Sequence, residues 1–102
     1  MNDYYNKYLT LLKDIILSSV DKSKYKVFLF GSRVSGSDKR YSDIDIGILG
    51  DKPLGSAYYK IINKIEACDI PYKVDIVDFN LVDKKFKEIA LKKVEIWNDP
   101  KS

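Results

Sequence analysis

The chain has 102 residues, of which 45% are hydrophobic and 32% are charged, and its net charge is +3. This length fits one small domain, and we expect residues 1–102 to form that single domain. Histidine is absent, which excludes Ser-His triads and most catalytic zinc sites. No apolar run approaches the ~20 residues of a membrane-spanning helix, so we expect no membrane partner.

The apolar pattern predicts alternating helices and strands along the chain. Helices are expected over residues 3–20, 56–67 and 81–93. Strands are expected over residues 25–31, 43–49, 72–79 and 94–97, the last of them at a sheet edge. This order predicts an α/β (α+β) fold, a small mixed β-sheet with helices packed mainly on one face. In the third helix, we expect one inward face made by Leu81, Phe86, Ile89 and Ala90, and lysines that mostly point outward.

The cysteine content and the N-terminal residues indicate the cellular compartment of the protein. Cys68 is the single cysteine, so an intrachain disulfide is impossible, and the N-terminal residues lack the basic start and apolar core of a secretory signal. We therefore expect a cytoplasmic location.

Acidic residues interrupt two of the predicted strands. Asp43 and Asp45 are two positions apart, so they point to the same face of a strand, with Ile44 and its apolar neighbours on the other. Asp75 lies in the following predicted strand. If these two strands are neighbours in phase, the three carboxylates converge on the open face of the sheet.

Converging carboxylates repel one another unless a cation lies between them. Oxygen ligands without His or Cys favour a hard ion such as Mg²⁺, which usually completes its coordination with substrate phosphates. The turn that precedes the acids suits a phosphate, because Gly31 and Gly36 allow close backbone approach and Ser32 supplies a hydroxyl.

These residues carry a resemblance to a known family. Gly31-Ser32 is followed by the ten residues "RVSGSDKRYS" and then by Asp43-Ile44-Asp45. This spacing, with Asp75 as a third acid on a later strand, resembles the nucleotidyltransferases of the polymerase-beta superfamily. "LFGSRVSG" is similar to the usual opening of their motif. The match is best with the minimal nucleotidyltransferase (MNT) antitoxins, which pair with helical HEPN toxins.

The resemblance implies a polymerase-beta-like fold and a protein adenylyltransferase that transfers AMP from ATP to a tyrosine of a HEPN ribonuclease toxin. By motif position, Asp43 and Asp45 would bind two Mg²⁺ ions, and Gly31 and Ser32 would grip the triphosphate. Asp75 would hold one metal ion and activate the attacking hydroxyl. The HEPN toxin would be both the acceptor and the complex partner, and we expect no separate domain that binds another acceptor.

Other interpretations stay open at this point. Arg33 either contacts phosphate or is a surface residue of the turn without a role at the site. The lysines of the third predicted helix form a solvated face, or else meet an acidic partner or RNA; direct nucleic-acid binding is not our expectation. The chain is alternatively a catalytically idle nucleotide-binding antitoxin that inhibits its toxin by complex formation alone. Transfer to a small molecule or an RNA end is a third possibility.

Overall fold

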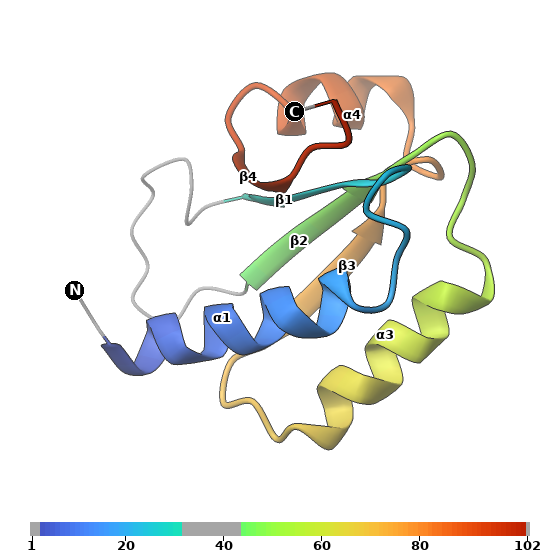
Figure 1. The fold of residues 1–102 in the computed structure, drawn as a ribbon. Coiled ribbons are helices and arrows are strands. Elements are labelled where there is room, and N and C mark those ends of the chain that lie inside the picture. The colour runs from blue at the N-terminus through green and yellow to red at the C-terminus, as the bar shows by residue number, and fades with distance from the viewer. Residues whose placement is uncertain (1–2, 32–43, 102) are drawn as a thin grey trace.

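The computed structural model describes residues 3–31 and 44–101. Within them, the helices are α1 (Asp3–Leu17), α3 (Ser56–Ala67) and α4 (Lys84–Ala90). The strands are β1 (Lys26–Phe30), β2 (Ile44–Leu49), β3 (Val74–Asp78) and β4 (Glu95–Asn98). Figure 1 shows these elements as one sheet with helices on both sides.

The strands form a mixed sheet in the order β3-β2-β1-β4. β1 is antiparallel to β2 and to β4, whereas β2 and β3 are parallel. α3 lies between the two parallel strands in the chain, as such a crossover requires. The predicted mixed sheet is confirmed, and β4 is the edge strand expected near the end of the chain.

One face of the sheet lies under α1 and α3, and α4 lies on the other side (Figure 1). The α1/α3 face holds the larger core, in which aliphatic side chains predominate. Its fully buried members are Leu12, Ile16, Val27, Ile44, Ile46, Ile48 and Ile61. Two of the three described helices share this face, so the prediction that helices pack mainly on one face is confirmed.

The opposite face carries a smaller, aromatic cluster. The ring of Phe79 lies against those of Phe28 and Phe30, with centroids 4.9 and 5.1 Å apart in edge-to-face contact. Gly47 lies beneath this cluster, and a Cβ there would collide with the rings of Phe28 and Phe79. The glycine in the middle of β2 therefore makes room for the aromatic side chains.

The helix predicted over residues 81–93 is shorter than expected, and part of its predicted inward face is wrong. The carboxylate of Asp83 accepts a hydrogen bond from the backbone N–H of Phe86 at 2.7 Å and so caps the start of α4. Leu81 thus lies outside the helix and is 72% exposed, and Ile89 and Phe86 are 59% and 42% exposed. Ala90 is half-buried against the aromatic cluster. A helix of seven residues covers only a part of that face.

α1 ends at Leu17, three residues before the predicted end. The hydroxyls of Ser18 and Ser19 both donate to the carbonyl oxygen of Ile15, at 3.0 and 2.7 Å. These side-chain bonds satisfy a carbonyl of the last helical turn and favour its end there.

None of the helices in the described part of the chain is long and apolar enough to span a bilayer. The cytoplasmic location stays a prediction.

Candidate functional site

β2 places three isoleucines on one face of the sheet and Asp45 on the other. Ile44, Ile46 and Ile48 are fully buried on the α1/α3 face. Asp45 is half-buried and points to the opposite face, since successive strand residues alternate. An aspartate is thereby held on a strand whose other side is anchored in the core.

The parallel pairing of β2 with β3 brings two of the predicted site residues together. Asp45 is the register partner of Asp75, and Ile46 that of Ile76. Neighbouring strands lie about 4.8 Å apart, and residues in register point to the same face. The expectation that the two strands are neighbours in phase is confirmed for Asp45 and Asp75. Asp43 lies outside the described residues.

Gly31 adjoins this pair at the end of β1. Its φ of 87° lies in the left-handed region that favours glycine. A Cβ at this position would collide with the Oδ2 atom of Asp45. Glycine is therefore required both by the backbone conformation and by the closeness of the Asp45 carboxylate. Ser32 and Arg33, the other predicted nucleotide-binding residues, lie outside the described residues.

The donor chemistry of the pair fits a hard cation. Asp45 and Asp75 contribute only carboxylate oxygens, the ligands that Mg²⁺ prefers, and two adjacent carboxylates repel each other in the absence of a positive charge. Among residues 3–31 and 44–101, no three Asp, Glu or Cys side chains gather closely enough to hold a metal ion. The described residues thus offer two carboxylates at this position, and Mg²⁺ usually completes its coordination with water and substrate phosphates.

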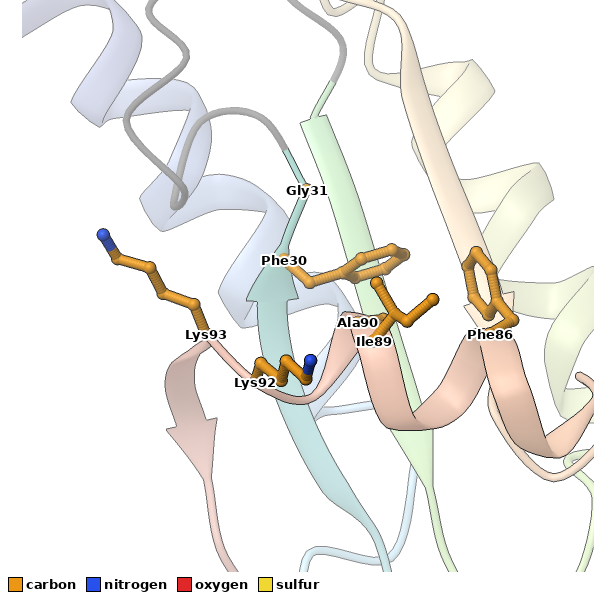
Figure 2. Close-up of a pocket in the computed structure, with 7 residues that line it drawn as sticks. All are labelled: Phe30, Gly31, Phe86, Ile89, Ala90, Lys92 and Lys93. Atoms are coloured by element: carbon orange, nitrogen blue, oxygen red, sulfur yellow. The ribbon is translucent and has the colours of Figure 1, made fainter.

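A hollow of about 440 Å³ opens beside Gly31. Figure 2 shows Phe30 of β1 facing Phe86 and Ile89 of α4 across this hollow, with Lys92 and Lys93 on the segment that follows the helix. Phe30 is the antiparallel register partner of Asp45, so the hollow adjoins the carboxylate pair. Phe30 and Phe86 were not among the site residues predicted from the sequence. For Phe30, the signal is an aromatic strand end directly before the Gly-Ser pair, whereas no motif in the sequence marks Phe86.

Asp78 is the other acid of β3, and the structure gives it a different environment. Its side chain is buried, at 8% exposure. Its Oδ2 atom accepts from the backbone N–H of Leu54 at 2.8 Å, and its Oδ1 atom from that of Asn80 at 3.0 Å. Asp78 faces the α1/α3 side of the sheet, as its strand neighbour Ile76 does. It therefore anchors the loop before α3 and lies apart from the carboxylate pair.

Comparison with known proteins identifies the family. The model of the family described as Polymerase beta, Nucleotidyltransferase matches residues 7–101. A protein of Haemophilus influenzae, named "Probable protein adenylyltransferase MntA", is 34% identical over 91 residues, which are 88% of this chain and 78% of the relative.

Solved structures agree with this assignment. A toxin–antitoxin crystal structure with AMP-PNP matches with a TM-score of 0.61 and 29% identity, over 90% of this chain and 70% of that chain. A mutant of the toxin–antitoxin MntA-HpeT matches with a TM-score of 0.59 and 26% identity, over 95% and 73% of the two chains. The complex of tri-AMPylated Shewanella oneidensis HEPN toxin with MNT antitoxin matches with a TM-score of 0.56 over 86% and 70%, and at 24% identity it supports the fold alone. The chain belongs to the polymerase beta nucleotidyltransferase family, and within that family it is an enzyme of the MNT antitoxin group.

Proposed function

We propose that this protein is a Mg²⁺-dependent adenylyltransferase that transfers AMP from ATP to a tyrosine of a HEPN toxin and thereby neutralises the toxin. The observation that carries the proposal is the pairing of Asp45 with Asp75 on adjacent parallel strands, with Gly31 against the Asp45 carboxylate. The relative named as a protein adenylyltransferase and the toxin–antitoxin structure with AMP-PNP support the same activity.

The proposed roles follow from the place of each residue in the sequence motif and from its chemistry. Asp43, Asp45 and Asp75 hold the magnesium ions, and Gly31, Ser32 and Arg33 bind the triphosphate. Bound Mg²⁺ supplies positive charge where negative charge develops during nucleotidyl transfer, and two ions are the usual number for this chemistry. The carboxylates need to be fixed in place before the substrate arrives, and the register of β2 with β3 does this for Asp45 and Asp75.

The transfer step needs a proton acceptor. The tyrosine oxygen of the toxin attacks the α-phosphorus of ATP, a new P–O bond forms, and the bond to the leaving pyrophosphate breaks. The phenolic proton passes to the carboxylate of Asp75, which acts as the general base. An unperturbed tyrosine hydroxyl has a pKa of about 10, so a positioned base accelerates its reaction at neutral pH.

A transfer assay tests the proposal against the alternative of an idle antitoxin. The protein is incubated with α-labelled ATP, Mg²⁺ and a purified HEPN toxin. We expect label on a toxin tyrosine, detected by mass spectrometry, and none when Mg²⁺ is chelated. Neutralisation of the toxin without any covalent label would overturn the proposed activity and favour inhibition by complex formation alone.

A further inference from the structure

We propose that the hollow between β1 and α4 binds the base of the nucleotide, and that Phe30, Phe86 and Ile89 form its walls. This inference rests on the proposed function, because it concerns how the same substrate is held. It adds a binding site made by residues outside the Gly-Ser and Asp-x-Asp motifs.

The position of the hollow is the first argument. Phe30 and Asp45 are register partners on adjacent strands, and both side chains point to the face that carries α4. Gly31 lines the hollow, and a Cβ at this position would collide with the carboxylate of Asp45. A ligand whose phosphates lie at the carboxylates can therefore extend along the sheet directly into this hollow.

The shape and lining of the hollow are the second argument. Its volume of about 440 Å³ lies within the usual range for small-molecule sites, about 300–1,000 Å³. The ring of Phe86 stands edge-on to that of Phe30, with centroids 6.2 Å apart and an interplanar angle of 88°. Phe86, at 42% exposure, presents the accessible ring surface, whereas Phe30 lines the hollow with only 8% of its surface exposed (Figure 2). Aromatic surfaces of this kind bind nucleobases by stacking, because every base has a flat π-face.

The exposure of Ile89 is the third argument. Its side chain lines the hollow and is 59% exposed. A base bound in the hollow would remove this apolar surface of Ile89 from water, which favours binding. Lys92 and Lys93 also line the hollow and are exposed. Their ammonium groups can donate hydrogen bonds to phosphate oxygens. An apolar cleft with cations at its margin matches a ligand that has a flat base at one end and phosphates at the other.

Calorimetric titration tests the proposal with two probes in the presence of Mg²⁺, ATP and inorganic tripolyphosphate, which lacks a base. Phe86→Ala removes one wall of the hollow, and Ile89→Trp fills it. Leu81→Trp is the matched control, since it also places tryptophan at an exposed aliphatic position, but outside the hollow. Circular dichroism establishes that each variant is folded.

We expect Phe86→Ala and Ile89→Trp to weaken ATP binding by roughly 5- to 100-fold, the scale of losing one stacked base. Tripolyphosphate binding should not change in either variant, and Leu81→Trp should bind both probes as the unchanged protein does. If Phe86→Ala proves unstable, Ile89→Trp alone decides the question.

Three results would overturn the proposal. ATP binding that is unchanged in both variants would show that the base lies elsewhere. Slower transfer with unchanged ATP affinity would assign the hollow to the acceptor side chain. Equal losses for ATP and tripolyphosphate would show damage to phosphate binding. An unchanged protein that binds neither probe would contradict the proposed function itself, which distinguishes that failure from the others.

Discussion

The two faces of the sheet are built for different purposes. The face under α1 and α3 is aliphatic, and Ile44, Ile46 and Ile48 are fully buried there. The face that carries α4 combines an aromatic cluster with two half-buried carboxylates, Asp45 and Asp75. A single strand, β2, contributes to both faces by simple alternation. The comparison teaches that the packed face supplies the stability that allows acidic side chains to be held close together on the other.

Substitutions of the acids on the α4 face test the difference between the two faces most strongly. We expect Asp45→Ala, like Asp43→Ala, to abolish AMP transfer, because a ligand to the metal is lost. The free energy of unfolding should stay the same or rise slightly as the repulsion between carboxylates is relieved. A transfer assay with α-labelled ATP and a urea titration measure the two quantities. Unfolding of both variants would show that these acids are structural.

Ile46→Ala is the converse change, one residue along the same strand. Ile46 is fully buried among aliphatic side chains of the α1/α3 face. Truncating such a residue costs about 2–5 kcal/mol in the free energy of unfolding, through lost burial and the cavity that remains. We expect the molecules that remain folded to transfer AMP at a nearly normal rate. A normal unfolding midpoint in urea would contradict the assignment of this face as the core.

The two acids of β3 distinguish a catalytic role from a structural one. Asp75→Asn keeps the shape but loses charge and basicity, so we expect transfer to slow at least ~100-fold, with a modest loss of Mg-ATP affinity. Asp78→Asn is its matched control. An amide cannot accept at both positions from the N–H groups of Leu54 and Asn80, so this variant should lose about 1–3 kcal/mol of stability. Its transfer rate when folded should change little. If Asp78→Asn abolished transfer and Asp75→Asn left the rate unchanged, the general base would be Asp78 and our assignment of Asp75 would be wrong.

Gly31→Ala tests whether the α4 face needs the close approach of Gly31 to the Asp45 carboxylate. The new methyl group would collide with the Asp45 carboxylate, and the φ of 87° is unfavourable for alanine. Misplacement of a catalytic group by about 1 Å can cost roughly 100-fold in rate, and we expect transfer to slow at least ~10-fold. Single-turnover kinetics with saturating Mg-ATP measure the effect. A rate equal to that of the unchanged protein would show that this approach to Asp45 is not needed.

The sequence predicts the carboxylate face well because its signal is local and periodic. The alternation of acids with isoleucines in residues 43–49 predicts a strand with a polar and an apolar face, and the position of Asp75 in the next strand completes the pair. The register between the two strands was not predicted, because the convergence of the acids rested on the assumption that these strands are neighbours in phase.

The environment of Asp78 and the packing of α4 could not be predicted in the same way. Asp78 bonds to the backbone of Leu54, 24 positions away, and no periodicity reports such a contact. In α4, the spacing of Phe86 and Ile89 indicates an apolar face, but spacing cannot show how much of the sheet remains for a helix to cover. Here Phe28 and Phe79 already fill much of that face. The partly exposed side chains of α4 are left at the hollow beside Gly31.

The most direct test of the account is whether Mg²⁺ controls ATP binding at the carboxylate face. Calorimetry would compare ATP binding with Mg²⁺ and with EDTA, in the unchanged protein and in Asp45→Asn. We predict weak binding of Mg²⁺ alone, and ATP binding that is far tighter with Mg²⁺ than with EDTA, because phosphate oxygens complete the coordination of the ion. Most of that difference should vanish in Asp45→Asn. ATP affinity that is the same with Mg²⁺ and with EDTA in the unchanged protein would contradict the account.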